Sequence, residues 1–422
     1  MQHKLMARDA QVNWHPYSQM KNTVHIPIVR GEGAYLYDAN GNSYLDMVCS
    51  WWVNLHGHAH PYIAQKVYEQ LTRLEHVIFA GFTHVGAIEL SERLLALLPK
   101  NQKKIFYSDN GSTAVEVALK MCIQYEQSKG RQKKKIMAFR QGYHGDTFGA
   151  MAVSERGHWT NCFSDYLFDV IYLDAPTATN FNLNKSIIDQ HANETICIIY
   201  EPLIQGAGGM LMHEACDLNL LMNYCKNQQI LLIQDEIFVG FGRTGTIFAA
   251  DQLNFEADLY CLSKGLTGGT MALGITSCTQ EIYQGFYHDD KKQAFFHGHS
   301  FTASPVACAA SLASLDLLLE EQTNKSIQHI ILMHQAFAGL LKECDKIENI
   351  RQYGTLLAFD WLVPEETSYF NSIQSYLYQR FLEHGILLRP LGNTIYLLPP
   401  YCISEQDLQR CYQLVLAVLK SD

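Results

Sequence analysis

The central part of the chain alternates short apolar runs with longer amphipathic stretches, and this alternation limits the possible folds more than any other feature. From about residue 104 to 280 the runs are rich in β-branched and aromatic residues, as buried strands separated by helices would be. The pattern predicts an α/β fold with a mostly parallel central sheet covered by helices on both faces. The expected strands are residues 104–108, 135–139, 168–173, 195–201, 230–234, 258–263 and 273–278.

The flanking segments predict smaller elements. Residues 24–47 carry glycine and asparagine turn signals between short apolar runs and predict a meander. After Pro305 an alanine-rich helix is expected to reach about residue 321, followed by helices alternating with strands such as 355–361 and 394–398. We therefore expect a large domain over residues 56–320 and a smaller α+β domain formed by residues 1–55 together with 321–422.

Composition narrows the classes of partner. A formal net charge of -10 argues against nucleic acid or an anionic membrane as the main partner. The chain has no uninterrupted apolar run of about 18 residues, and its first residues lack the apolar core of a signal peptide, so we expect a cytoplasmic protein without a membrane span. The 12 cysteines include no CxxC pair and are expected to be free thiols.

Candidate site residues follow the predicted strands, where open α/β sheets bind ligands. After strand 104–108, the residues Gly111, Ser112 and Thr113 begin a helix whose unpaired N–H groups and hydroxyls suit a phosphate. An ordinary capping arrangement with Glu116 would explain the same residues without a ligand.

Strand 230–234 leads into Asp235 and Glu236. A buried carboxylate there needs a cationic partner, which could be a protonated pyridine nitrogen or, as a structural ion pair, Arg243. The glycine pattern that includes Arg243, residues 240–245, lacks the strand–turn–helix context of a dinucleotide site. Tyr143, after strand 135–139, could stack on a planar ring or pack in the core.

Strand 258–263 leads into Lys264, with glycines at 265, 268 and 269. A single lysine is most often a solvated surface charge. Combined with a phosphate cradle, a stacking aromatic ring and a buried carboxylate, it predicts a pyridoxal 5'-phosphate site in which Lys264 bonds to the cofactor and the glycines admit it closely. The alternating histidines of residues 56–60 lack carboxylate or cysteine ligands nearby, so no metal is expected.

Over essentially its whole length the chain resembles the class III, fold-type I aminotransferases. The blocks 235–245 and 263–269 carry this resemblance, supported by residues 14–17, 50–52, 142–151, 201–210, 389–390 and 396–401. The agreement is best with members that transfer the amino group of S-adenosylmethionine to 8-amino-7-oxononanoate in biotin synthesis, which is the activity that the resemblance implies. Alternatives are another ω-amino-acid aminotransferase, the same reaction with lysine as donor, and a non-catalytic cofactor-binding protein.

The resemblance also implies roles for individual residues. Lys264 would bond to pyridoxal phosphate and move the proton, Asp235 would bind the pyridine nitrogen, and Tyr17 would assist catalysis. The cofactor site would comprise Gly111, Ser112, Tyr143, Asp235, Ile237, Lys264 and, from the partner subunit of a homodimer, Ser300. The substrate pocket would comprise Tyr17, Trp51, Trp52, Tyr143, Gly298 and Arg389, with Arg389 as the carboxylate clamp. The family often has Thr at position 300 and Asn at 304, where this chain has serines.

Overall fold

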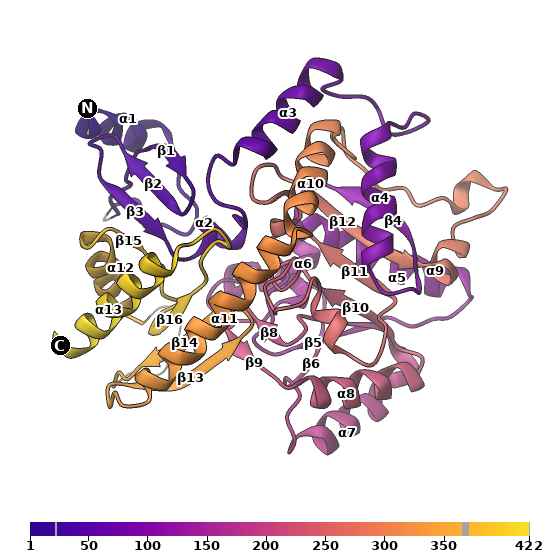
Figure 1. The fold of residues 1–422 in the computed structure, drawn as a ribbon. Helices are drawn as coiled ribbons and strands as arrows, with labels where there is room; N and C mark the ends of the chain where they lie inside the picture. Colours follow the sequence, from indigo (N-terminus) through magenta and orange to yellow (C-terminus); the bar gives the residue numbers. More distant parts are fainter. Residues whose placement is uncertain (22, 365–370, 422) are drawn as a thin grey trace.

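The computed structural model describes residues 1–21, 23–364 and 371–421. Figure 1 shows a large body built around a central sheet and a smaller body in which the N- and C-terminal segments lie side by side. Strands β3 (Ser43–Asp46) and β15 (Ile386–Leu387) pair in parallel and join these two segments in one sheet. The smaller body therefore draws on both ends of the chain, while the domain boundaries at 55/56 and 320/321 stay predictions.

The large body is organised by a seven-stranded sheet of order β4-β12-β11-β10-β7-β5-β6. Strands β11, β10, β7, β5 and β6 pair in parallel, whereas β12 is antiparallel to β11 and β4. A parallel neighbour requires a long crossover, but the β11–β12 connection contains one short 3₁₀ turn, so β12 runs back beside β11. The mostly parallel sheet is thus confirmed. Its strands are β4 (Gln102–Ser108), β5 (Lys135–Phe139), β6 (Ile171–Leu173), β7 (Thr195–Tyr200), β10 (Leu231–Asp235), β11 (Leu259–Leu262) and β12 (Gly274–Thr279).

All seven strands expected from the sequence are present. Strand β6 differs most from its predicted range, because it begins at Ile171 and not at residue 168. Phe168 is 43% exposed, and its carbonyl oxygen accepts a hydrogen bond from the Arg156 guanidinium. The local sequence pattern therefore predicts the start of this strand three residues too early, in a partly exposed stretch of chain.

Helices cover both faces of the sheet (Figure 1). Ile136 and Ile199 pack in one apolar cluster with α5, while their neighbours Met137 and Ile198 belong to a second cluster with α4 and α8. Alternate strand residues thus point to opposite faces, and both faces are apolar, as expected of a parallel sheet. The helices of this body are α3 (Pro61–Arg73), α4 (Val85–Leu97), α5 (Gly111–Ser128), α6 (Phe148–Val153), α7 (Phe181–His191), α8 (Ala215–Asn227), α9 (Gln280–Gln284) and α10 (Pro305–Leu318).

The predicted N-terminal meander is confirmed, since β1, β2 and β3 pair as antiparallel neighbours. The alanine-rich helix α10 ends at Leu318, three residues earlier than expected, because a new helix begins at Glu321. The remaining elements are α1 (Gln2–Val12), β1 (Ile28–Glu32), β2 (Tyr35–Asp38), α2 (Cys49–Trp52), β8 (Ile204–Gln205), β9 (Leu211–Met212), α11 (Glu321–Leu341), β13 (Ile347–Tyr353), β14 (Leu356–Trp361), α12 (Ile373–Glu383), β16 (Thr394–Leu397) and α13 (Glu405–Ser421).

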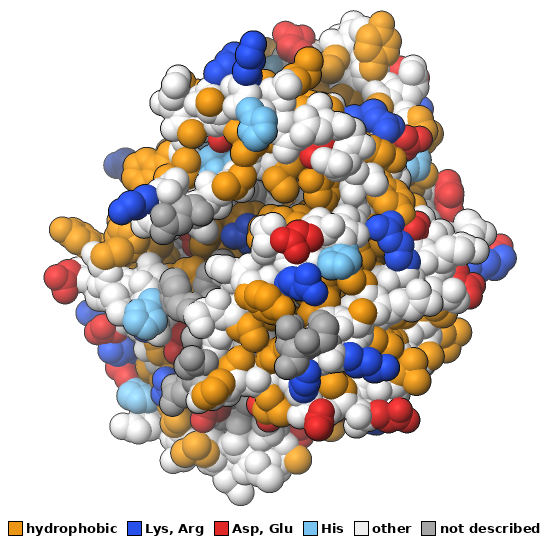
Figure 2. Space-filling view, turned by 90° about the vertical axis from the view of Figure 1, so that its left-hand side faces the viewer, with side chains coloured by type: hydrophobic (Ala, Val, Ile, Leu, Met, Phe, Trp, Pro, Cys, Tyr) orange, Lys and Arg blue, Asp and Glu red, His pale blue; other side chains and the backbone are white. Residues whose placement is uncertain are grey.

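The surface and the cysteines fit a globular chain. On the face shown in Figure 2, charges of both signs lie interspersed among hydrophobic side chains, and the surface is hollowed near its centre. None of the helices in the described parts of the chain combines the length and the apolar character needed to cross a bilayer. The cysteines are free, as expected.

Candidate active site

A cavity of about 660 Å³ lies at the carboxyl ends of β4, β5, β7, β10 and β11. This is the edge of the sheet at which the sequence placed its candidate residues, and it is where such sheets bind ligands. Seven predicted residues line the cavity together: Trp52, Gly111, Ser112, Tyr143, Asp235, Ile237 and Lys264.

Lys264 follows β11 and faces the cavity with its amine. Its Nζ atom lies 4.7 Å from the ring centre of Trp52 and 5.4 Å from that of Phe238. Burial lowers the pKa of the amine from 10.5 to about 8, although the carboxylates of Asp235 and Glu201 act in the opposite direction. A lysine with this pKa is available in its neutral, nucleophilic form close to neutral pH. Its backbone has φ 45°, a left-handed conformation that non-glycine residues adopt rarely.

Asp235 ends strand β10 with its carboxylate fixed from two sides. Oδ1 accepts a hydrogen bond from the backbone N–H of Ile237 at 3.0 Å, and Oδ2 lies 2.7 Å from Nδ1 of His144. Arg243, the alternative partner considered from the sequence, instead donates to backbone oxygens of Phe238 and Trp52. The acid therefore remains directed into the cavity.

Glu236, the second acid of the pair, lies outside this arrangement. Its carboxylate accepts hydrogen bonds from the backbone N–H groups of Ala249 and Ala250 and from the side chain of Gln234. Burial raises its pKa to about 7. Glu236 thus holds a buried loop, and the two adjacent acids have separate roles.

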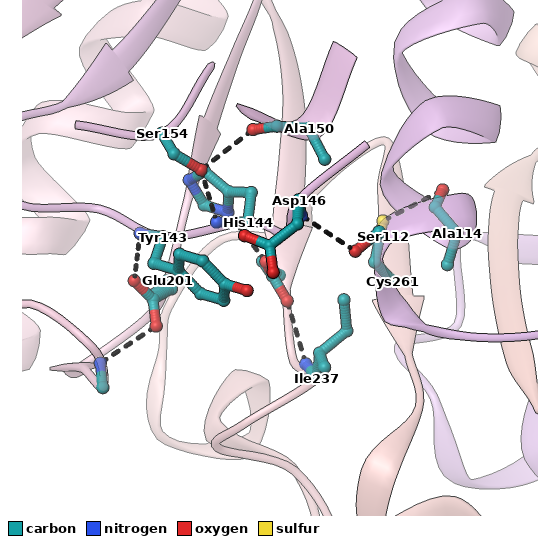
Figure 3. Close-up of polar contacts among 12 residues, drawn as sticks. Ser112, Ala114, Tyr143, His144, Asp146, Ala150, Ser154, Glu201, Ile237 and Cys261 are labelled. Carbon is teal, nitrogen blue, oxygen red and sulfur yellow. Dashed lines mark hydrogen bonds and ion pairs between the residues drawn. The ribbon is translucent and has the colours of Figure 1, made fainter. Parts of the chain in front are cut away.

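Glu201 follows β7 and holds the loop that carries Tyr143 (Figure 3). Its Oε2 accepts the backbone N–H of Tyr143 at 3.1 Å, and its Oε1 accepts that of Gly206 at 3.0 Å. Burial raises the pKa of Glu201 to about 7, and the nearby charge of Asp235 adds to the effect. Burial also raises the pKa of the Tyr143 hydroxyl, so this ring stays neutral.

The start of α5 forms the expected cradle with one difference. Asn110 caps the helix by accepting the N–H of Thr113 at 3.0 Å, so the Thr113 N–H is already used and Gly111 and Ser112 remain to bind an anion. Glu116 does not cap α5, because its carboxylate accepts N–H groups at the start of α6. A Cβ atom on Gly145 would lie 2.1 Å from Oγ of Ser112, so the approach of these two loops requires glycine.

The glycines that follow Lys264 have a packing role in addition to the predicted one. A Cβ atom on Gly265 would lie 2.9 Å from Leu55, one on Gly268 would lie 2.9 Å from His56, and one on Gly269 would lie 3.0 Å from the Asn54 backbone. Gly269 is among the residues that line the cavity, and the expectation that these glycines admit the cofactor stays a prediction. They allow the lysine turn to pack against residues 53–56.

Tyr17, Trp51 and Arg389 form a second group of predicted residues beside the cavity. The Tyr17 hydroxyl donates to the carboxylate of Asp146 and lies 3.4 Å from the Tyr143 hydroxyl. The ring centres of Tyr17 and Trp51 lie 5.4 Å apart, and the guanidinium carbon of Arg389 lies 4.8 Å from the Trp51 ring centre. The group therefore adjoins the cavity through Tyr143.

Gly298 and Ser300 lie apart from these residues. Both are exposed in the segment before α10, and neither lines the cavity of its own chain. Their assignment to the site of a partner subunit stays a prediction.

Sequence reasoning did not single out three cavity residues, His144, Asp146 and Glu201. His144 and Asp146 lie in the same glycine-flanked block as Tyr143, and Glu201 directly follows β7, a strand whose presence was correctly predicted. The position of a residue directly after a predicted parallel strand could therefore have indicated these residues as candidates for the site. The Nε2 atom of His144 is buried without a hydrogen-bond partner among the described residues. The ring therefore contacts Asp235 through Nδ1 alone.

Two of the alternating histidines make hydrogen bonds with neighbouring side chains. His56 lies 3.0 Å from Oγ of Ser314, and His58 lies 2.9 Å from Asp46. Asp9, His15 and His25 also lie near one another, but the two rings are stacked at 3.6 Å with an angle of 12°. In-plane nitrogen lone pairs of nearly parallel rings point side by side and do not converge on one ion.

Comparison with known proteins agrees with the family resemblance noted in the sequence. The sequence matches the family model described as aminotransferase class-III over residues 17–419. It is 42% identical over 417 residues to a protein of Synechococcus elongatus named adenosylmethionine-8-amino-7-oxononanoate aminotransferase, which covers 96% of this chain and 98% of that one.

Solved structures show the same similarity. The crystal structure of the enzyme of that name from Methanocaldococcus jannaschii has a TM-score of 0.95 and 33% identity, with 99% of each chain covered. An amine transaminase from an uncultivated Pseudomonas species, solved in its PLP-bound form, has a TM-score of 0.90 and 26% identity, with 97% and 98% covered.

Proposed function

The chain belongs to the class III aminotransferase family, and on this premise we propose that it transfers the amino group of S-adenosylmethionine to 8-amino-7-oxononanoate in biotin synthesis. The relatives named for this reaction match nearly the full length of the chain, which supports the choice within the family. The observation that carries the chemistry is the meeting of Lys264 and Asp235 in one cavity. A catalytically inert cofactor-binding protein would not need the amine with the lowered pKa.

We propose pyridoxal 5'-phosphate as the cofactor, because the cavity suits each of its parts. The Gly111 and Ser112 N–H groups suit the phosphate, Asp235 the pyridine nitrogen, and Tyr143 and Ile237 the ring faces. When bound, the cofactor would act as an electron sink for negative charge at the substrate carbon. The rigid hold on the Asp235 carboxylate from Ile237 and His144 supports this assignment.

The residues around the cofactor position have distinct tasks. Lys264 Nζ can both take and return a proton near neutral pH, because its pKa is about 8. Asp235 stabilises a positive charge opposite its fixed carboxylate. Glu201 holds the backbone of Tyr143, and thereby the ring that packs over the site.

One pocket must accept a sulfonium amino acid and an apolar keto-amine in turn. Aromatic walls suit both, since Tyr17, Trp51 and Trp52 offer cation–π attraction to the sulfonium and apolar contact to the alkyl chain. Arg389 would bind a carboxylate of either substrate with its planar fork. Its position 4.8 Å from the Trp51 ring centre supports a shared pocket.

The proposed functional unit is a cytoplasmic homodimer. In it Ser300 of one subunit would contribute a hydroxyl to the phosphate of the other, and Gly298 would border the substrate pocket. The exposure of both residues in the single chain is compatible with this role.

The test is a half-reaction. The purified yellow protein is mixed with S-adenosylmethionine alone, and the visible absorbance of the bound cofactor is followed. Loss of the band, and its return on addition of 8-amino-7-oxononanoate, is the expected result. Loss of the band with lysine but not with S-adenosylmethionine would assign a different donor, and no response to any of these compounds would contradict the proposed function.

A further inference from the structure

The two tryptophans of the proposed substrate pocket lie on a strained turn. Cys49, Ser50 and Trp52 have φ angles of 49°, 60° and 64°, and Ser50 combines its angle with ψ -73°. Non-glycine residues keep such conformations only when their surroundings hold them, and held strain is concentrated at functional sites. The contacts that hold this turn therefore bear on the geometry of the proposed substrate pocket.

Asp46 is the main support of the turn. It is fully buried, and its Oδ1 accepts the backbone N–H of Val48 at 3.1 Å. Its Oδ2 accepts the backbone N–H of Ser50 at 2.7 Å and the Ser50 hydroxyl at 3.2 Å. One carboxylate thus fixes the residues on either side of Cys49, directly before Trp51.

His58, one of the alternating histidines of residues 56–60, orients this carboxylate. Its Nε2 lies 2.9 Å from Oδ2 of Asp46, and its Nδ1 lies 2.9 Å from Nδ2 of Asn54. The amide nitrogen of Asn54 can only donate, so Nδ1 accepts and Nε2 carries the proton that is donated to Asp46. Backbone hydrogen bonds to Gly33 hold the His58 main chain independently of its side chain.

The far end of the turn faces the lysine. The carbonyl oxygen of Trp52 accepts a hydrogen bond from the Arg243 guanidinium at 2.9 Å, and its indole N–H donates to the Tyr396 hydroxyl at 3.0 Å. Trp52 is buried against Lys264, whereas Trp51 is 40% exposed beside Tyr17 and Arg389. The turn separates the two adjacent indoles: Trp52 lines the cavity beside Lys264, whereas Trp51 lies next to Tyr17 and Arg389.

We propose that Asp46 and His58 are positioning residues that hold the Trp51–Trp52 turn and thereby set the affinity of the substrate pocket. This inference rests on the proposed function only in assigning substrate contact to the two tryptophans. Neither residue touches the cavity, so both act through the turn.

The test compares Asp46→Asn with Asp38→Asn. Asp38 is also a buried aspartate of the same meander, and it also holds a turn, accepting the backbone N–H groups of Asn40 and Asn42 at 2.9 Å. That turn contains no cavity residue, which makes it a matched control. Asp46→Asn keeps only one of the two acceptor oxygens, so its NH2 group must face either the Val48 N–H or the Ser50 N–H and the proton of His58, none of which it can accept.

The expected result is a rise in KM of ~10- to ~100-fold for both substrates in Asp46→Asn, with kcat and the cofactor absorbance changed far less. Asp38→Asn should lower the melting temperature by about as much as Asp46→Asn does, but it should not raise KM. Hydrogen exchange should accelerate in a peptide spanning residues 47–54 of Asp46→Asn and in one spanning 39–44 of Asp38→Asn. Equal KM values in the two variants, or unchanged exchange in residues 47–54, would overturn the proposal.

A second pair of variants separates orientation from simple loss of stability. His58→Ala should raise KM as Asp46→Asn does, and His58→Gln, whose amide N–H can still reach Asp46, should restore part of the affinity. Absence of that rescue would overturn the role of His58. Failure of the wild-type protein to turn over the two substrates would reject the proposed function. Hydrogen exchange is measured without substrate, so the positioning of the turn by Asp46 and His58 would still be tested by it.

Discussion

Lys264 and Trp52 lie against one another, with the amine 4.7 Å from the centre of the indole ring. The lysine follows a strand of the large body, whereas the tryptophan belongs to the strained turn after the N-terminal meander. The glycines at 265, 268 and 269 make this approach possible, because a Cβ atom at any of them would collide with residues 54–56. The reacting end of the cavity is therefore assembled from two distant parts of the chain.

Replacement of Lys264 by alanine should abolish turnover and shift the cofactor absorbance, because no other amine among the cavity residues can carry the proton. We expect kcat to fall by at least ~100-fold, as for the loss of a general acid–base group. The measurement is steady-state turnover together with an absorbance spectrum. Lys325→Ala, on the exposed surface of α11, is the control, and normal turnover by Lys264→Ala would contradict the mechanism.

Replacement of Gly145 by alanine should weaken cofactor binding. The new Cβ atom would meet Oγ of Ser112 at 2.1 Å, and φ 130° at this position disfavours any side chain, so the phosphate cradle must move. Loss of one charge-assisted hydrogen bond costs about 1.5–3 kcal/mol, which is at least tenfold in the cofactor dissociation constant. Titration of the apoprotein with pyridoxal phosphate measures this constant. Gly157→Ala is the control, because a Cβ atom there meets open space; equal affinities of the two variants would refute the cradle.

Glu201 should make the stability of the apoprotein depend on pH. Burial raises its pKa from 4.5 to about 7, so between these values the folded protein holds a proton that the unfolded chain has released. The contribution of Glu201 is thus fully present below pH 4.5 and is lost as the pH rises through 7. Relative to Glu201→Gln, which cannot titrate, the wild-type free energy of unfolding should fall by on the order of 3 kcal/mol across this window. Urea unfolding at several pH values measures it, and a pH-independent difference would argue against a buried, protonated carboxyl.

Replacement of Arg389 by lysine keeps the charge but removes the planar fork and the stacking on Trp51. We expect KM for both substrates to rise about tenfold, or about 1.4 kcal/mol, with a smaller change in kcat. Arg30→Lys is a matched control, because that guanidinium also lies over an aromatic ring, at 3.7 Å from the centre of Tyr37, and neither Arg30 nor Tyr37 belongs to the proposed substrate pocket. Indistinguishable KM values for the two variants would exclude Arg389 as the carboxylate clamp.

The sequence predicted the strands well because each is a local apolar run, and it predicted Asp235 and Lys264 because each directly follows such a run. It did not predict that Glu201 holds Tyr143, since the two lie 58 positions apart and the contact exists only after β5 and β7 pair. The antiparallel direction of β12 was also missed, because it follows from a short connection and not from the composition of the strand.

Local patterns are enough to predict which side chains stand at the ends of the strands, because periodicity and turn residues act over a few neighbouring positions. Which of these side chains meet depends on how the elements pack in three dimensions. Arg243 holds the backbone of Trp52, His144 holds Asp235, and Asp46 with His58 holds the tryptophan turn. Each pairing satisfies a buried polar group, and which group lies within reach is set by the packing of elements far apart in the chain.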